Sequence, residues 1–450
     1  MNSTFTPDNL RKIYISNFAL SKVTGIDSIQ PRHFAKNQSK DINTIVTKVF
    51  FEEYEFTRYK EKLISKGANK YPRQIAIPTL RDRIALKALN NYLQKKLSDH
   101  LNIQVPQQAT RDVKSALKTG KFETVIKIDI KDFYPTISHQ ILEEKLKTLG
   151  IENTAITLIR NAISTGFEKD KKNIIGIPQG LSISNILAEI YMNEIDEKIS
   201  KYNIFYKRYV DDVLIFCKKN EDTNIYSHFI KEVNALKLKT HEVSDNSDKT
   251  IMQPINDEFS YLGYIYNPKM DDSKKTIPIK SSSKITTSIR HSSRKKFQDA
   301  IAALFTSYSN AGKQRSKALL FWKLNLRITG CIANKKCKGW LFFFSEIDDM
   351  LMLFNLDNMI KKLCIRHHVE YKGVKKLTRA IHEIKHNKWN NNYFPNFDTY
   401  NYKNMKEVIS YDKGIPVHKL KLSEQDIENK FWNIINREVK SMETDISSFS

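Results

Sequence analysis

The sequence predicts an α+β protein, and three observations support this prediction. The acidic stretch Tyr209-Val210-Asp211-Asp212 stands between two runs of apolar, β-branched and aromatic residues, which is typical of the tip of a β-hairpin. A second β-branched run, Val125 to Asp129, also ends in an acid. Basic segments with apolar residues at helical spacing, such as residues 281–345, predict helices around these strands.

The acid pair at the hairpin tip allows two interpretations. Adjacent carboxylates between buried strands cost free energy unless a positive group neutralises them. Mg²⁺ suits such a turn, because it needs only one or two carboxylates and takes its other ligands from water and phosphates. The alternative is an ordinary solvated turn, since Asp is common in turns.

The composition of the chain limits the classes of protein to which it can belong. The chain has 450 residues, enough for about three structural units with cores of their own. Its 74 basic and 50 acidic residues give a net charge of +24, as expected of a protein that holds a polyphosphate backbone. Four scattered cysteines without a CxxC pair favour a reducing cytoplasm. Neither an export signal nor an apolar run of about 18 residues is present, so we expect no membrane segment.

Before the acids, a short strand and a helix carry arginines. Residues 71–78 alternate and end in proline, which predicts a strand, and residues 81–83 open a helix with apolar periodicity. Guanidinium groups here either grip a triphosphate or are ordinary surface charges.

The strand that ends in Asp129 leads into an aromatic pair, Phe133 and Tyr134. If this strand neighbours the hairpin in one sheet, Asp129 faces the acid turn. Such a carboxylate cluster can hold two metals about 3.5 to 4 Å apart, the layout used for in-line displacement at phosphorus. Tyr134 would form the floor beneath a bound sugar, or it belongs to an ordinary core.

Five motifs follow one another along residues 125–263 in a fixed order. In this order they resemble the successive palm motifs of a reverse transcriptase, and residues 73–83 resemble the fingers motif of that family. The resemblance covers about residues 25 to 270 and favours the metal-binding interpretation of the acid turn over the solvated one. The motifs are Asp129 with Phe133-Tyr134, Pro178-Gln179-Gly180, Tyr209-Val210-Asp211-Asp212, Leu236-Lys237-Leu238 with Lys249-Thr250, and Tyr261-Leu262-Gly263.

The resemblance implies a right-hand polymerase with fingers, a palm built on an antiparallel sheet, a helical thumb and a helical C-terminal extension. We expect the N-terminal segment and fingers in residues 1–120, and the palm with part of the fingers in residues 121–270. The basic helical thumb would follow in residues 271–350, and the extension in residues 351–450.

The resemblance also implies a role for each matching residue. Asp129, Asp211, Asp212 and the main-chain carbonyl of Ile130 would bind two Mg²⁺ ions, with Mn²⁺ as an alternative. Together with these acids, Lys249 would be catalytic, as the group that protonates the leaving pyrophosphate.

Four further residues would bind the nucleotide: Arg73 at the triphosphate, Gln179 and Gly180 in the pocket wall, and Tyr134 as the steric gate against a ribose 2′-OH. Two places depart from the family pattern. Many bacterial relatives have Ser-Pro where this chain has Ser184-Asn185, and residues 245–248 lengthen the segment before the lysine.

The positive charge of residues 281–345 predicts a protein surface that binds nucleic acid. This segment holds thirteen Lys or Arg and one acid, Asp299, which exceeds what a solvated face needs. We expect its helices to contact duplex phosphates. The aromatic run of residues 339–344 fits the thumb core better than a base-stacking platform. The candidate contacts are Arg290, Arg294, Lys295, Lys296, Lys313 and Arg315.

Two patterns in the second half allow a zinc site. His382-Glu383-Ile384-Lys385-His386 matches the zinc-protease helix motif, although no third ligand is evident. Cys331, Cys337, Cys364 and His367 have irregular spacing for a structural site. We expect zinc at neither.

The expected function is an RNA-directed DNA polymerase that adds dNTPs to a 3′ end on an RNA template. The chain looks like the stand-alone bacterial reverse transcriptases of anti-phage defence (the DRT, abortive-infection and retron-like group). Expected partners are a non-coding RNA, the DNA product and dNTPs, with a homo-oligomer or a partner polymerase as further options. Two alternatives stay open: a template-independent or protein-primed DNA polymerase, and a non-catalytic RNA-binding scaffold.

Overall fold

The computed structural model of this chain describes residues 1, 3–19, 21, 23–65, 71–101, 105–168, 172–243, 249–267, 286–312 and 316–446. Two compact units make up the chain. The first unit consists of Met1–Gln104 and Phe122–Pro254, and the second unit consists of Val105–Lys121 and Ile255–Ser450. This division differs from the four segments expected above, whose boundaries stay a prediction.

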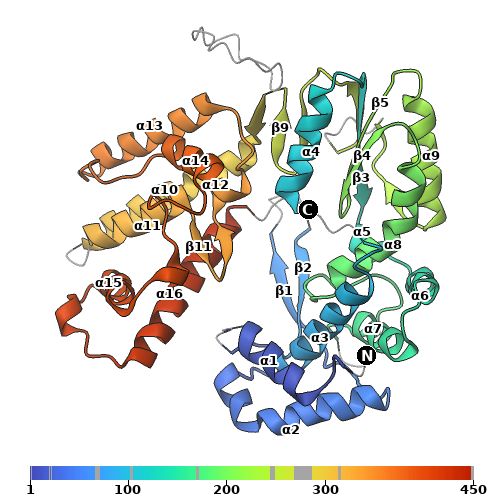
Figure 1. Ribbon diagram of the computed structural model, residues 1–450, viewed down its shortest axis with the longest axis horizontal. Coiled ribbons are helices and arrows are strands. Elements are labelled where there is room, and N and C mark those ends of the chain that lie inside the picture. Colours follow the sequence, from blue (N-terminus) through green and yellow to red (C-terminus); the bar gives the residue numbers. More distant parts are fainter. Residues whose placement is uncertain are drawn as a thin grey trace. The chain divides into compact units, whose positions relative to one another are not determined.

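The N-terminal part of the first unit combines three helices with a two-stranded antiparallel hairpin (Figure 1). The third helix begins after Thr79, whose hydroxyl donates to Asp82 at 2.7 Å and accepts from the Asp82 N–H, so a reciprocal cap fixes its start. The predicted strand and the helix after it are therefore both present. The elements are α1 (Pro7–Asn17), α2 (Pro31–Phe50), β1 (Lys60–Ile64), β2 (Arg73–Ile77) and α3 (Leu80–Lys96).

A five-stranded antiparallel sheet forms the centre of the first unit. The strand order is β4-β5-β3-β6, and β7 pairs with the other end of β3 on the same side as β6. Val213, Leu214 and Ile215 are fully buried, as β-branched and apolar strand residues covered on both faces should be. The antiparallel sheet is as predicted. Its strands are β3 (Thr124–Lys131), β4 (Phe205–Tyr209), β5 (Asp212–Cys217), β6 (Lys239–Thr240) and β7 (Ile251–Pro254).

Five helices complete the first unit, and their apolar sides join the sheet in one continuous core. Among them, the helix that follows the Pro178-Gln179-Gly180 motif begins at Ser184 and ends at Ile199. The helices are α5 (Phe133–Thr136), α6 (His139–Thr148), α7 (Asn153–Ser164), α8 (Ser184–Ile199) and α9 (Asp222–Ala235).

The second unit begins with short strands and basic helices. A three-stranded antiparallel sheet has the order β10-β9-β8. Trp340 and Phe344 are buried, with exposed fractions of 1% and 0%, so the aromatic run is a core element as expected. The elements are α4 (Pro106–Lys118), β8 (Phe259–Tyr261), β9 (Tyr264–Tyr266), β10 (Thr287–Ile289), α10 (His291–Asn310), α11 (Lys317–Thr329), β11 (Cys331–Ala333), β12 (Lys336–Lys338) and α12 (Trp340–Phe343).

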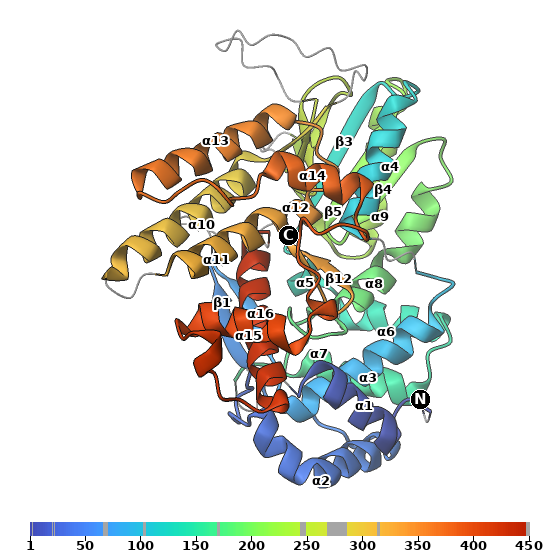
Figure 2. The same ribbon diagram turned by 60° about the vertical axis from the view of Figure 1, so that its left-hand side comes forward.

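The C-terminal part of the second unit is helical. Helices α15 and α16 lie side by side in both views and share a hydrophobic core with the β11 strand and the end of α11 (Figures 1 and 2). The elements are α13 (Met350–Arg366), α14 (Leu377–His386), η3 (Phe397–Thr399), α15 (Tyr402–Lys413), η4 (Val417–Lys419) and α16 (Glu424–Thr444).

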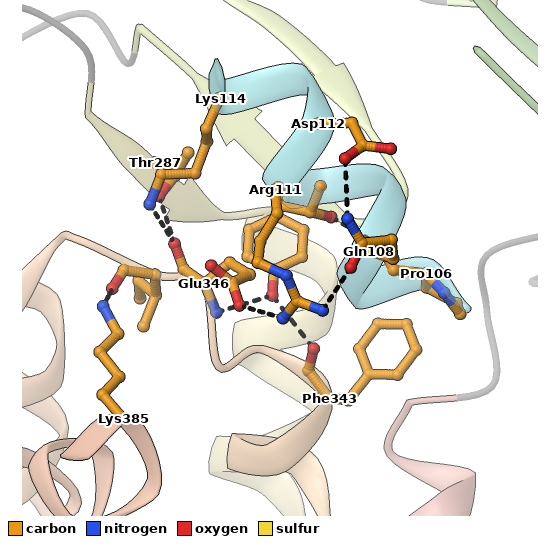
Figure 3. Close-up of polar contacts among 12 residues, drawn as sticks. Pro106, Gln108, Arg111, Asp112, Lys114, Thr287, Phe343, Glu346 and Lys385 are labelled. Atoms are coloured by element: carbon orange, nitrogen blue, oxygen red, sulfur yellow. Dashed lines mark hydrogen bonds and ion pairs between the residues drawn. The ribbon is translucent and has the colours of Figure 1, made fainter. Parts of the chain in front are cut away.

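Helix α4 comes early in the sequence but packs with residues that follow it by more than two hundred positions. Its Arg111 forms an ion pair with Glu346 at 2.9 Å, and its Lys114 forms one with Asp348 at 2.7 Å. The Lys114 ammonium and the Thr287 hydroxyl both donate to the Glu346 carbonyl (Figure 3). These contacts fix α4 in the second unit.

Within the ranges that the structure describes, no helix combines the length and the hydropathy needed to cross a membrane.

Candidate active site

The acid turn is the tip of a β-hairpin, as the sequence predicts. Tyr209 at the end of β4 pairs with Asp212 at the start of β5, so Val210 and Asp211 form a two-residue turn. Val210 has a φ of 58°, a left-handed conformation that is strained for a β-branched residue. Such strain persists where the surrounding structure enforces it, and it is common at functional sites.

Strand β3 brings Asp129 to the same end of the sheet. Asp129 pairs with Asp212 in the register of β3 and β5, and the Ile130 N–H donates to the Asp211 carbonyl at 3.2 Å. Three acids from two neighbouring strands therefore converge at one place, as expected if the strands were neighbours.

The convergence changes the chemistry of Asp211. Burial raises the pKa of this carboxyl group to about 6, and the charges of Asp212 and Asp129 act in the same direction, whereas Arg73 opposes them. The fold thus holds like charges together at a cost that a bound cation would remove. It also brings Arg73, the residue expected at the triphosphate, within electrostatic reach of the acids.

Lys249 lies beside the first acid. Its ammonium donates to Asp129 Oδ2 at 2.7 Å, and the His241 ring nitrogen Nε2 is 2.8 Å from the ammonium and 3.4 Å from the same carboxylate oxygen. The Asp129 N–H donates to the Thr250 hydroxyl at 3.3 Å. The structure therefore brings Lys249 to the acids, while the unusual residues 245–248 lie outside its described part.

The donor set fits a hard divalent ion. In the described part of the chain, no three Asp, Glu, His or Cys side chains already stand as a ligand cluster. Mg²⁺ does not require one, because one or two carboxylates suffice when substrate phosphates and water supply the rest. Asp129 and Asp211, with the Ile130 carbonyl, are the groups that would hold it, and Asp129 already accepts a cationic partner.

A buried ionic network holds the hairpin, and the sequence prediction missed it. The Arg208 guanidinium, whose side chain is only 3% exposed, donates to Glu189 and Asp196 of α8, each at 2.6 Å at its shortest. It also donates to the carbonyl of the strained Val210 at 3.0 Å. The Tyr206 hydroxyl donates to Asp196 at 2.6 Å. Arg208 thus connects the turn to a helix.

A signal for this network exists in the sequence. Glu189 and Asp196 are seven residues apart on a helix, so they share one face. Arg208 directly precedes the acid motif within a strand whose other residues are apolar or aromatic, apart from Lys207. A charged residue in such a strand is buried only with partners, and two acids on one helix face supply them.

The loop before α8 contacts β2, which lies in the segment that resembles the fingers motif. The Ala76 N–H donates to the Gln179 carbonyl at 2.7 Å. Gly180 has a φ of 106°, and a Cβ at this position would stand 2.6 Å from the Ala76 carbonyl oxygen, so only glycine permits this approach. Gln179 and Gly180 therefore lie against β2, the strand that begins with Arg73.

Tyr134 follows β3 on the short helix α5 and is 9% exposed. Its hydroxyl donates to Asn185 Oδ1 at 2.8 Å. Burial raises its pKa, and the charge of Asp211 acts in the same direction, so the ring lies near the acid cluster.

The predicted nucleic-acid contacts belong to the second unit. Lys295 and Lys296 are exposed on α10 and Arg294 is half-buried. Arg290 donates to the Ser260 hydroxyl, so it has a structural contact of its own. Lys313 and Arg315 lie outside the described residues.

The zinc-protease motif does not form a metal site. The rings of His382 and His386 are 4.8 Å apart and exposed. Between them, Glu383 is buried in an ion pair with Arg379 and accepts from the Asn387 amide at 2.9 Å. The catalytic base of such a motif would thus be occupied, and no third ligand stands nearby among the described residues.

The cysteines do not assemble a zinc site either. Cys331 and Cys364 are buried, Cys337 is partly buried, and His367 contacts the Ser309 hydroxyl at 2.6 Å. No metal-binding group that includes them stands among the residues the structure describes.

Comparisons with known proteins agree with this geometry. Residues 64–266 match the family model "Reverse transcriptase (RNA-dependent DNA polymerase)". The chain is 26% identical to the retron Ec83 reverse transcriptase of Escherichia coli over 47% of its length and 72% of that protein. It is 22% identical to the protein YkfC of Escherichia coli K12 over 53% of its length and 74% of that protein.

Other similarities cover less of the compared protein. The chain is 31% identical to an uncharacterized 91 kDa protein in a cob intron of Schizosaccharomyces pombe, over 35% of its length and 21% of that protein. A solved structure of apo telomerase from Candida tropicalis, truncated from its C-terminal domain, has a TM-score of 0.36 and 15% identity over 54% of this chain and 61% of that chain. This last likeness is too weak to carry an argument.

Proposed function

From the premise that residues 64–266 form a reverse transcriptase domain related to bacterial retron reverse transcriptases, we propose that this protein is an RNA-directed DNA polymerase. It belongs among the nucleotidyltransferases, and its reaction is the transfer of nucleotides from dNTPs to a 3′ end on an RNA template.

One observation carries the proposal: β3 and the β4–β5 hairpin bring Asp129, Asp211 and Asp212 to one end of a sheet. Like charges held together by a strained turn are expensive for the fold, which is the signature of a site selected for cation binding. The α+β architecture with an antiparallel sheet supports the assignment of a polymerase palm.

The mechanism follows from what each residue can do. Asp129, Asp211 and the Ile130 carbonyl would hold two Mg²⁺ ions, with Asp212 beside them. Bound there, the ions would supply the positive charge that stabilises the attacking 3′-oxygen and the leaving pyrophosphate. The Lys249 ammonium, 2.7 Å from Asp129, is a proton donor for that pyrophosphate. The remaining contribution of the chain is to bind the dNTP and the 3′ end and to position them for the reaction.

The nucleotide-binding roles are assigned in the same way. Arg73 stands at the start of β2 and would grip the triphosphate through its planar guanidinium group. Gln179 and Gly180, held against β2, would line the pocket. Tyr134, buried near Asp211, would be the steric gate that selects a deoxyribose.

We assign fingers to residues 1–120, palm to 121–270, thumb to 271–350 and extension to 351–450, with α4 as a segment of the fingers range that belongs to the second unit. Arg290, Arg294, Lys295, Lys296, Lys313 and Arg315 would contact the template–product duplex through its phosphates.

The biological role is a finer proposal. Similarity to the retron Ec83 and retron Se72 reverse transcriptases supports a function with a dedicated non-coding RNA in bacterial anti-phage defence. We place the enzyme in the cytoplasm, with a homo-oligomer or a partner polymerase as further components.

Purification from the native locus followed by sequencing of bound nucleic acid tests the proposal. The protein is incubated with labelled dNTPs, with and without Mg²⁺, and an Asp211→Asn, Asp212→Asn variant is the control. We expect a discrete RNA whose complement appears in Mg²⁺-dependent labelled DNA. Labelled DNA without an RNA complement would instead establish untemplated or protein-primed synthesis, and absence of synthesis with an unimpaired variant in vivo would establish a scaffold.

A further inference from the structure

Tyr134 is held in place from three sides. Its ring packs against Phe133 with centroids 5.6 Å apart, and its carbonyl accepts from the Ile177 N–H at 2.8 Å. Gly176 has a φ of 86°, and a Cβ there would stand 2.7 Å from the Pro135 carbonyl oxygen. The loop after Gly176 therefore runs directly against the backbone of the aromatic segment.

The same loop delivers Asn185 to the Tyr134 hydroxyl. The Ser184 hydroxyl donates to the Pro178 carbonyl at 2.7 Å and so fixes the entry into α8, where Asn185 is the second residue. Asn185 is exposed, yet its Oδ1 accepts from the Tyr134 hydroxyl at 2.8 Å.

A steric gate must reject ribose, so it matters whether the Tyr134 hydroxyl already has a hydrogen-bond partner. A largely buried hydroxyl without a partner loses its hydrogen bonds to water, so any new partner is favoured. In a sugar pocket, the 2′-OH of an rNTP is such a partner, and binding it would offset the steric cost that the ring imposes. A hydroxyl whose single proton already goes to Asn185 can no longer donate to the 2′-OH, so it gains less from binding it.

We propose that Asn185 is a specificity-determining residue: it takes the proton of the Tyr134 hydroxyl, so that the gate has no hydrogen-bond donor to offer a ribose 2′-OH. The inference rests on the proposed function, because it takes Tyr134 as the gate of a DNA polymerase. Tyrosine together with Asn185 then does what phenylalanine would do alone.

Single-nucleotide extension with dNTPs and rNTPs on one RNA template tests this. The measured quantity is the ratio of kcat/KM for a dNTP to that for the matching rNTP. Asn185→Ala should lower this ratio about three- to tenfold, the effect of one hydrogen bond. Tyr134→Phe should keep it within twofold, and the Tyr134→Phe, Asn185→Ala double variant should return it to the Tyr134→Phe value.

Asn193→Ala is the matched control, since Asn193 is on the same helix and its amide donates to Glu197 at the surface. It should leave the ratio unchanged. A ratio unchanged in Asn185→Ala, or a double variant as permissive as Asn185→Ala, would overturn the inference. Tyr134→Ala distinguishes a failure of this inference from a failure of the proposed function. If Tyr134→Ala does not raise rNTP use, or if the unaltered protein makes no DNA, the proposed function fails as well.

Discussion

Two carboxyl groups of this chain, the half-buried Asp211 in the first unit and the buried Asp445 in the second, have nearly the same pKa, and for both the largest cause is desolvation. Burial raises the pKa of each to about 6. Their neighbours differ. The charges of Asp212 and Asp129 raise the pKa of Asp211 further, whereas Arg327 and Lys296 lower that of Asp445.

A raised carboxyl pKa therefore does not by itself identify a functional site. The charges that surround the carboxyl group distinguish the two cases. Asp445 has Arg327 Nη1 at 3.5 Å, and other acids of the same unit, such as Glu346 and Asp348, have Arg111 and Lys114 as partners. The fold neutralises these acids internally. Around Asp211, by contrast, the charges of two further carboxylates outweigh that of Arg73, while Lys249 pairs with Asp129.

Removing one acid of the hairpin end should have the largest effect. We expect Asp129→Asn to lower DNA synthesis by at least about 10³-fold, because a carboxylate that stabilises the transition state is lost. Its thermal stability should change little, because the loss of like-charge repulsion on Asp211 is offset by the loss of the partly exposed ion pair with Lys249. Activity and thermal unfolding are measured together. A variant that is inactive only because it is unfolded would contradict this account.

Neutralising the network behind the hairpin should have the next largest effect. Arg208→Met alone leaves the partly buried Glu189 and Asp196 without their cation and should destabilise the protein by up to about 3–5 kcal/mol. With Glu189→Gln and Asp196→Asn added, the protein should fold but lose the donor to Val210. We then expect kcat to fall about ten- to a hundredfold with KM for the dNTP nearly unchanged.

Arg160→Met is the control for this network, because Arg160 pairs with Glu143 at 2.7 Å with half of its side chain exposed. It should change kcat less than twofold. An Arg208 triple variant with the kcat of the unaltered protein would remove Arg208 from a positioning role.

Substitution of the exposed lysines of α10 should affect nucleic-acid binding more than the rate of nucleotide transfer. Lys295→Gln with Lys296→Gln should weaken nucleic-acid binding several-fold and reduce the salt slope of log K by about two, since two phosphate contacts are lost. Lys361→Gln with Lys362→Gln, two exposed changes on α13, is the comparison. Equal salt slopes for both pairs would mean that α10 is no special contact surface.

The pH dependence of Asp445 should give the smallest effect. Its carboxyl pKa is higher in the folded protein than the ordinary 3.8, so the folded state binds more protons between about pH 4 and 6. The stability gained by keeping it neutral is therefore complete below about pH 4 and is lost as the pH rises through 6, by at most about 3 kcal/mol. Asp445→Asn should flatten unfolding curves measured across this range, and an unchanged pH profile would contradict the shift.

Local sequence patterns predicted that the acids lie together, whereas their role in metal binding came from the family resemblance and stays a prediction. Alternating apolar residues around Asp211 and Asp212 identify a hairpin, and a strand of like composition ends in Asp129. Antiparallel pairing in register then brings the acids together, and the structure has this pairing. The helix that residues 81–83 open also follows from its apolar periodicity.

Contacts over long sequence distances were not predictable. The helical pattern of residues 106–118 does not tell which core the helix joins, and only tertiary ion pairs with Glu346 and Asp348 assign it to the second unit. The β11–β12 hairpin turns at Asn334 and Lys335, both with positive φ, without the glycine that normally signals such a turn.

Single-nucleotide incorporation by the unaltered protein, Asp211→Asn and Asp445→Asn, on one RNA template with one DNA primer in Mg²⁺, tests the central claim most directly. Both substitutions remove a carboxyl group whose pKa is raised to about 6 by desolvation. The account predicts that Asp211→Asn abolishes incorporation and that Asp445→Asn keeps it within about twofold. Equal loss in both variants, or undiminished incorporation by Asp211→Asn, would contradict the assignment of the active site to the hairpin tip.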